Sequence, residues 1–224
     1  MNTSYSGKAI RKPYYGQSTT IFGTTFRSKL EAEWAAFFTI IGIRWEYEPH
    51  KVNTRSGGYV PDFVLTDLHG GLICEVKPYG RYDEDTTCTE QKLRDACVQL
   101  KKSGTVLRGN PYKFCVEDLK DTGASVSGGA HGMFFKPQTD VFPADEIGWD
   151  APYLFCVCPH CWKAGYEFDG RGERICRGAC GHKTVIDARN FDHLGHGDKG
   201  YSASHPRIML AAKTAAEIVW QESR

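Results

Sequence analysis

The sequence predicts an α/β protein in which helices flank a mixed sheet, followed by a small cysteine-rich module and a last helix. Apolar residues at helical spacing over 28–42 and 89–104, with strand-like segments between them, predict the helices and the sheet. Two closely spaced cysteine pairs beyond residue 155 predict the module. The 224 residues suffice for one core and one small satellite.

The composition is that of an ordinary globular protein. Hydrophobic residues make up 41% and charged residues 25%, so a packed core is expected. No run of about eighteen apolar residues occurs, which excludes a membrane span, and the polar N-terminus lacks the apolar stretch of a secretory signal. We therefore expect a cytoplasmic protein, in which cysteines stay reduced or bind metal.

Residues 1–25 are expected to form a basic and aromatic arm. Five basic residues precede the first acidic one: Lys8, Arg11, Lys12, Arg27 and Lys29. Tyrosines are interspersed among them, and this mixture suits a phosphate backbone with exposed bases. A solvated, partly disordered arm explains the same composition equally well.

A helix is expected to begin after Ser28 and to end at Gly42. Ser28 and Glu31 have the spacing of a capping box, and Gly42 suits a C-cap. Between them the apolar residues recur at helical spacing: Leu30, Trp34, Phe37, Phe38 and Ile41.

The rest of the predicted core, 26–145, alternates strands and helices. Strands are expected over 44–48, 59–65 and 72–77, the first three forming a meander, and over 105–107 and 133–136. Pro78 ends the third strand because it cannot donate to a ladder. A second helix is expected from Thr89 or Glu90 to Ser103.

Two of these strands carry a set of charges suited to a metal site. Glu75 and Lys77 are two residues apart on one strand and so project from the same face. If the strand folds back on the one that holds Asp62, the two carboxylates approach and can share Mg²⁺ or Mn²⁺. The carbonyl of Val76 is a further candidate ligand. The alternative is a group of surface charges on a two-sided sheet.

Four segments in order resemble the PD-(D/E)xK nucleases, and most closely their phage and transposon branch, which cuts branched or transposon-end DNA. The segments are Phe26-Arg27-Ser28-Lys29-Leu30-Glu31-Ala32-Glu33-Trp34, Trp45-Glu46-Tyr47-Glu48-Pro49, Tyr59-Val60-Pro61-Asp62-Phe63 and Cys74-Glu75-Val76-Lys77-Pro78. The resemblance covers roughly residues 25–112 and implies a restriction-endonuclease-like core.

The resemblance also implies roles for individual residues. Asp62 and Glu75 would bind the metal, Glu31 would complete its shell, and Lys77 would orient the attacking water. Gln91 would be a supporting polar residue on the second helix. The implied activity is metal-dependent endonucleolytic cleavage of DNA. Helical phase alone does not distinguish Glu31 from Glu33 as the metal-binding glutamate. If Glu31 is not a ligand, it would serve only as the acidic residue of the capping box.

The cysteine-rich module, 153–190, predicts a zinc ribbon. Cys158 and Cys161 form a C-x2-C pair, and Cys176 and Cys180 form a C-x3-C pair after fourteen intervening residues. Four thiolates at such spacing bind structural Zn²⁺ in a closed tetrahedral site. Cys156 or His182 would be the substitute ligand if one of the four is not used.

The last segment, 204–224, is expected to be a helix with a face of small residues. That face suits packing on the core or formation of a homodimer. His193, His196 and His205 lie in or beside the preceding loop and predict either a polar loop or a second metal site. Two other functions remain open: a non-catalytic zinc-ribbon protein that binds nucleic acid, and a nuclease whose target is RNA.

Overall fold

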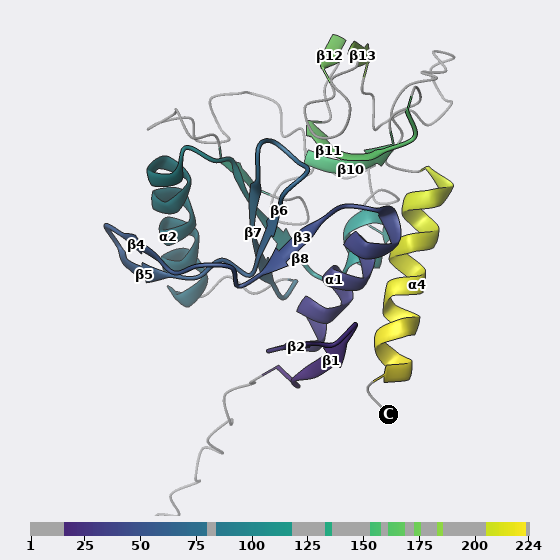
Figure 1. The fold of residues 1–224 in the computed structure, drawn as a ribbon, viewed down its shortest axis with the longest axis horizontal. Helices are drawn as coiled ribbons and strands as arrows, with labels where there is room; N and C mark the ends of the chain where they lie inside the picture. The colour runs from purple at the N-terminus through teal and green to yellow at the C-terminus, as the bar shows by residue number, and fades with distance from the viewer. Residues whose placement is uncertain are drawn as a thin grey trace, which may run out of the picture.

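The computed structural model describes residues 16–79, 84–117, 133–135, 153–157, 161–168, 173–175, 183–185 and 205–222. They form a mixed α/β fold (Figure 1). Its centre is a five-stranded sheet in the order β3-β6-β7-β8-β9, with only β7 and β8 parallel. Among these residues no helix is long and apolar enough to cross a membrane.

The sheet contains β3 (Trp45–Tyr47), β6 (Phe63–Leu65), β7 (Leu72–Lys77), β8 (Gly104–Arg108) and β9 (Met133–Phe135). Four antiparallel pairs of strands lie outside it: β1 (Thr19–Ile21) with β2 (Thr24–Phe26), β4 (Val52–Thr54) with β5 (Gly57–Tyr59), β10 (Tyr153–Val157) with β11 (Ala164–Phe168), and β12 (Glu173–Ile175) with β13 (Lys183–Val185). The helices are α1 (Lys29–Ile41), α2 (Glu84–Leu100), the π-helical turn η1 (Lys113–Glu117) and α4 (Pro206–Glu222).

Helices cover the two faces of the sheet unequally. On one face, α1 lies beside α4, and the sheet contributes Phe63, Cys74 and Leu107 to a large core with them. On the other face, α2 packs through Leu93, Ala96 and Cys97 in a smaller core. Because side chains alternate along β7, Cys74 and Val76 enter the first core, whereas Ile73 enters the second. Glu75 and Lys77 therefore point to the α2 side.

The ends of α1 are set by the residues that the sequence indicated. The Ser28 hydroxyl accepts a hydrogen bond of 3.2 Å from the Glu31 backbone N–H, and Gly42 ends the helix in the left-handed conformation with φ 80°. The Ile43 N–H then donates to the Phe38 carbonyl at 2.9 Å, which satisfies an otherwise unpaired carbonyl of the last turn. The predicted helix over 28–42 is confirmed.

Three expectations about the core need correction. The expected strand 59–65 is two strands, because Gly57–Tyr59 pairs with Val52–Thr54 in a hairpin and the chain bends at Asp62 before β6. Helix α2 begins at Glu84, within the expected polar loop, where acidic residues favour the start of a helix without any apolar period. The expected arm 1–25 contains the hairpin β1–β2, whose Ile21 is buried in the main core.

The hairpin β10–β11 is part of the main core rather than a separate satellite. Phe155 and Tyr166 are fully buried and stack at 4.7 Å between ring centroids. The Tyr166 hydroxyl hydrogen-bonds the Thr105 hydroxyl at 2.9 Å, and the Tyr166 carbonyl lies 2.6 Å from the His69 ring nitrogen. The cysteine-rich module is thus tied to the central sheet through its first hairpin.

Helix α4 packs back on α1. Its buried face, with Ile208, Ala212, Ala215 and Val219, lies in the main core. Arg207 donates to the Ile41 carbonyl at 2.8 Å and also to the Trp162 carbonyl, so it links α4, α1 and the β10–β11 connection. The small-residue face is therefore already occupied within one chain.

Candidate functional site

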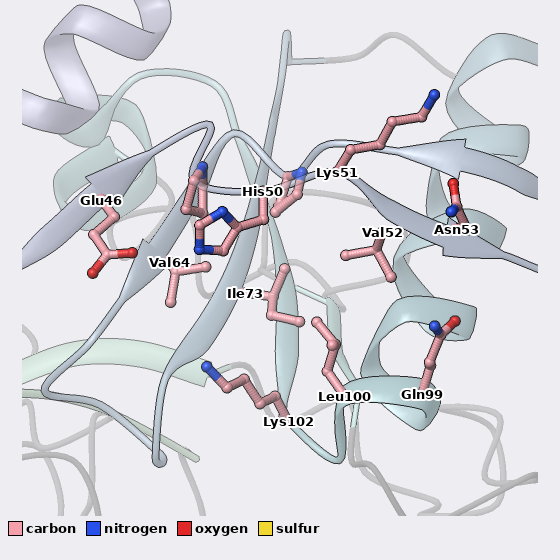
Figure 2. Close-up of a pocket in the computed structure, with 12 residues that line it drawn as sticks. Glu46, His50, Lys51, Val52, Asn53, Val64, Ile73, Gln99, Leu100 and Lys102 are labelled. Atoms are coloured by element: carbon pink, nitrogen blue, oxygen red, sulfur yellow. The ribbon is translucent and has the colours of Figure 1, made fainter.

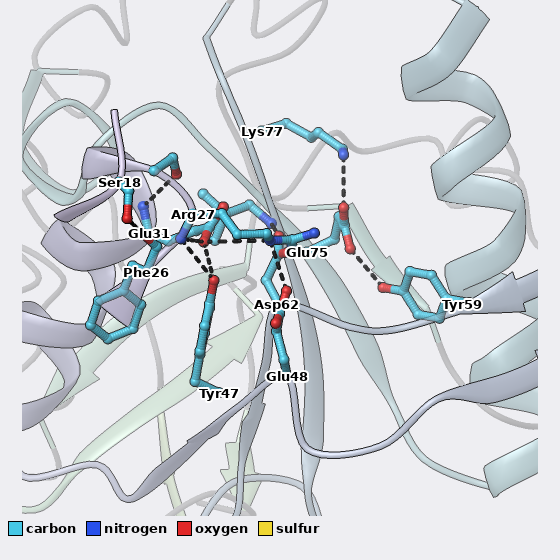
Figure 3. Close-up of polar contacts among 12 residues, drawn as sticks. Ser18, Phe26, Arg27, Glu31, Tyr47, Glu48, Tyr59, Asp62, Glu75 and Lys77 are labelled. Atoms are coloured by element: carbon cyan, nitrogen blue, oxygen red, sulfur yellow. Dashed lines mark hydrogen bonds and ion pairs between the residues drawn. The ribbon is translucent and has the colours of Figure 1, made fainter. Parts of the chain in front are cut away.

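The turn before β6 and the middle of β7 bring Asp62 and Glu75 together. Phe63 pairs with Cys74, and extension of this antiparallel register by one residue sets Asp62 opposite Glu75. The Asp62 Oδ2 atom accepts a 2.7 Å hydrogen bond from the Val76 backbone N–H. Both carboxylates are almost fully buried, at 3% and 5% exposure. The predicted approach of these two residues is what the fold produces (Figure 3).

Each oxygen of Glu75 has a donor. The Lys77 ammonium lies 2.7 Å from Oε1, and the Tyr59 hydroxyl donates to Oε2 at 2.8 Å. Burial and the neighbouring Glu75 raise the pKa of Tyr59 well above its usual range, so the phenol keeps its proton and remains a donor. Glu75, Lys77 and Tyr59 thus form one hydrogen-bonded group on the α2 side of the sheet.

Glu31 reaches the same region from the first turn of α1. Its Oε2 accepts hydrogen bonds from the Tyr47 hydroxyl at 2.6 Å and from the Arg27 backbone N–H at 3.1 Å. In a complete capping box the carboxylate would instead accept from the backbone N–H of Ser28. Only the Ser28 half of that box is made, so the Glu31 carboxylate is turned toward the β3 strand and Arg27.

Arg27 links the carboxylates to one another. Its Nη2 lies 2.5 Å from Asp62 Oδ1, and its Nε lies 2.7 Å from Glu48 Oε1 and 4.0 Å from Glu31 Oε2. Burial raises the pKa of Asp62, and repulsion by Glu75 and Glu31 raises it further, while the Val76 N–H and Arg27 lower it. Glu31, Asp62 and Glu75 therefore belong to one electrostatic cluster.

The cluster has the chemistry of a cation site but is closed by the protein's own donors. Buried carboxylates that repel one another favour a shared cation, and hard oxygen ligands suit Mg²⁺ or Mn²⁺. As the side chains stand, however, no three His, Cys, Asp or Glu in the described part of the chain are arranged to hold a metal ion. Arg27 and Lys77 take the positions of positive charge instead, so a metal would require one or both to move.

The remaining residues predicted for the nuclease site are distributed as follows. Gln91 is exposed and donates to Asp95 at 3.0 Å, away from Glu75. The Lys29 ammonium lies 4.7 Å from the centre of the Trp220 ring, on the α4 side. Lys8, Arg11 and Lys12 lie outside the described residues. Of the five basic residues predicted to contact nucleic acid, Arg27 is the one that the described structure brings to the carboxylates.

The zinc ligands are mostly beyond what the structure describes. Cys158, Cys176, Cys180 and the substitute His182 lie outside the described ranges, as do His193 and His196. Cys161 is half-buried and Cys156 is buried on β10. The His205 ring packs against Trp162 at 5.7 Å, and its Nδ1 accepts from the Arg207 N–H at 3.1 Å, at the start of α4.

A buried ion pair beneath the site was not predicted. Arg108, only 1% exposed, pairs with Glu90 from α2, and it lies beside Lys77 in the parallel register of β7 and β8. The α2 residue that contacts the central sheet near Lys77 is thus Glu90, whereas the sequence had indicated its neighbour Gln91. The signal in the sequence was a lone arginine at the end of an apolar strand.

A pocket of about 450 Å³ lies on the α2 side of the sheet, between the β4 region and the end of α2 (Figure 2). Pro61, which precedes Asp62, is one of its walls, and Val64 and Ile73 form its apolar part. His50, Lys51 and Lys102 stand around it. The pocket therefore offers basic groups next to the Asp62 turn.

Glu33 differs from Glu31 although both are on the first turns of α1. Burial raises the pKa of Glu33, while Lys29 and a hydrogen bond from Asn110 lower it, with burial the larger effect. A raised folded-state pKa means that the native protein gains stability as the pH falls toward the unfolded value and loses it as the pH rises through the folded value.

Glu33→Gln is therefore expected to raise Tm slightly at pH 7, by about 1–2 °C, since 1 kcal/mol shifts a domain of this size by about 2–4 °C. The advantage over wild type should shrink as the pH is lowered, because protonated Glu33 carries no charge either. Thermal melts of both proteins between pH 7 and pH 4.5 measure this difference. A variant that is less stable at pH 7 would contradict it.

Comparisons of the chain with family models, with curated proteins and with solved structures found no match.

Proposed function

We propose that the protein is a metal-dependent endonuclease of the PD-(D/E)xK type that hydrolyses DNA, with a restriction-endonuclease-like core and an appended zinc ribbon. One observation carries the proposal: Glu31, Asp62 and Glu75 form a single electrostatic cluster, in which Lys77 contacts Glu75 and Arg27 contacts Asp62. The three carboxylates come from a helix, a turn and a strand, and Glu75 is 44 residues from Glu31 in the sequence. Surface charges on an ordinary sheet would not be buried together.

Glu31, Asp62 and Glu75 would hold Mg²⁺ or Mn²⁺ together with the Val76 carbonyl. The Val76 N–H already faces Asp62, and a strand residue directs its N–H and C=O to the same side, so this carbonyl lies toward the cluster. Magnesium, when bound there, would polarise the scissile phosphate and lower the pKa of a bound water. The Lys8, Arg11, Lys12, Lys29 and Arg27 side chains remain candidates for backbone contacts with DNA.

The chain's own residues would do the rest. Lys77 projects from a central strand and is mostly buried, so its ammonium is held at a fixed point where it can orient the attacking water and stabilise the developing negative charge. Tyr59 fixes Glu75 from the opposite side with a hydroxyl that stays protonated. Val76 fixes Asp62 through its backbone.

The zinc ribbon is supported by where its cysteines fall in the sequence. Cys158 and Cys161 lie between the paired strands β10 and β11, and Cys176 and Cys180 lie between the paired strands β12 and β13. Two hairpins that each carry a cysteine pair in their connection are the arrangement of a ribbon. Such short hairpins bury little apolar surface of their own, so Zn²⁺ would stabilise them.

The function is tested by plasmid nicking with Mg²⁺, with Mn²⁺ and with a chelator, on wild type and on the matched pair Glu31→Gln and Glu33→Gln. We expect cleavage that needs the metal. Glu31→Gln should reduce it by about 10–100-fold, the usual cost of losing a group that supports a metal site. Glu33→Gln should cleave like wild type, because Glu33 turns to Asn110 rather than to the carboxylate cluster.

Two results would contradict the proposal, and each would favour a different function. If wild type binds DNA but nicks no plasmid under any metal condition, the protein is a non-catalytic binder. If labelled RNA is degraded in preference to labelled DNA in a competition, the site acts on RNA. A panel of duplex, flap, fork and four-way-junction substrates would then define which DNA shape is cut.

A further inference from the structure

One guanidinium stands among three carboxylates at the edge of the site. Arg27 contacts Asp62 and Glu48 directly and Glu31 at 4.0 Å (Figure 3). Its side chain is 59% exposed, whereas that of Asp62 is 4% exposed. The Arg27 guanidinium is therefore accessible to solvent, whereas the Asp62 carboxylate that it contacts is buried.

The same contact occupies the carboxylate that a metal would need. Asp62 accepts from Arg27 at Oδ1 and from the Val76 N–H at Oδ2, so both of its oxygens are engaged. A divalent cation that binds Asp62 would lie close to the guanidinium and repel it. An arginine with an exposed side chain can leave without disturbing the core, because no apolar cluster contains it.

We propose that Arg27 is an internal counter-ion of the site, which holds Asp62 in the free protein and transfers to a substrate phosphate when a divalent cation takes its place. This inference rests on the proposed function. Guanidinium binds phosphate with paired hydrogen bonds, so DNA offers Arg27 a partner to replace Asp62. Cation binding and DNA binding then favour each other, and by linkage each raises the affinity of the other by the same factor.

The proposal is tested on the free protein by isothermal titration with Mn²⁺, without DNA, for wild type, Arg27→Gln and Arg27→Lys. Arg27→Gln should bind Mn²⁺ at least about fivefold more tightly than wild type, the lower range of measured couplings between sites. Arg27→Lys should fall between them, because an ammonium keeps the charge but loses the forked contact with two carboxylates. Arg44→Gln is the matched control, since Arg44 pairs with Asp67 in an exposed ion pair outside the cluster.

The second measurement is DNA affinity by fluorescence anisotropy, with Ca²⁺ and with chelator. Wild type and Arg44→Gln should bind DNA several-fold more tightly with Ca²⁺, and in Arg27→Gln this ratio should fall toward one. Arg27→Lys keeps the test decisive if Arg27→Gln does not fold.

Failure of the inference is distinguishable from failure of the function. Equal or weaker Mn²⁺ binding by Arg27→Gln and Arg27→Lys, together with loss of Mn²⁺ binding in Glu31→Gln, would overturn the counter-ion role and leave the metal site intact. No Mn²⁺ binding by wild type or by either Arg27 variant would overturn both.

Discussion

Lys77→Met is expected to abolish DNA cleavage while DNA affinity stays within about twofold of wild type. The loss should be at least about 10²–10³-fold in kcat, the usual cost of removing one preorganised group that stabilises charge in the transition state. Methionine preserves the length and the apolar stem of the side chain, which is only 20% exposed, so packing at the end of β7 should survive. Single-turnover cleavage and filter binding separate the two quantities.

Lys102→Met is the control for this prediction. Lys102 lines the pocket on the α2 side of the sheet, whereas the two Glu75 oxygens are contacted by Lys77 and Tyr59. Its loss should leave kcat unchanged. An unaltered cleavage rate in Lys77→Met would refute the role of Lys77, and a parallel fall in DNA affinity would make it a docking residue instead.

Removal of zinc is expected to destabilise the whole protein, not only the ribbon. Phe155 and Tyr166 are buried in the main core and belong to β10 and β11, the strands that flank the first cysteine pair. If the double substitution Cys158→Ser and Cys161→Ser releases the metal, the β10–β11 hairpin is no longer cross-linked by zinc. The packing of Phe155 and Tyr166 in the main core is then weakened. A loss of about 3–4 kcal/mol would lower Tm by about 10 °C in a domain of this size.

Elemental analysis and thermal melts check this prediction. Wild type should contain about one zinc per chain, and the double variant none. Cys88→Ser is the control, because Cys88 is exposed on α2 and far in sequence from the two pairs, and it should retain both zinc and Tm. A wild-type protein that is folded but free of metal would exclude the ribbon.

The sequence predicted those elements whose limits are set locally. Helix α1 has its cap residues and its apolar stripe within one segment, and β7 ends at a proline, so both were located closely. The strand before β6 was misassigned, because Tyr59 and Phe63 read as one alternating run although the chain leaves the strand conformation at 60–62, between them. Three-residue strands such as β1 are too short to show a period.

Four charged members of the cluster were predictable from the sequence, whereas its tyrosines and the neighbouring Arg108–Glu90 pair were not. Asp62, Glu75 and Lys77 follow from strand spacing, and Glu31 from the resemblance. Tyr59 and Tyr47 were not selected, because a tyrosine at a strand end shows nothing of which carboxylate it will contact 16 residues away. The Arg108–Glu90 pair likewise depends on how α2 crosses β8, which no local pattern encodes.

The position of α4 has a consequence for how the protein is made. The helix that carries Glu31 is covered by residues 206–222, which leave the ribosome long after it does. Until then the apolar stripe that includes Phe37 and Ile41 lacks its cover from α4, and exposed apolar surface of this kind makes an incomplete chain prone to aggregate. If the proposed function is right, the site would become rigid only late in synthesis, and the nascent chain would be a poor enzyme.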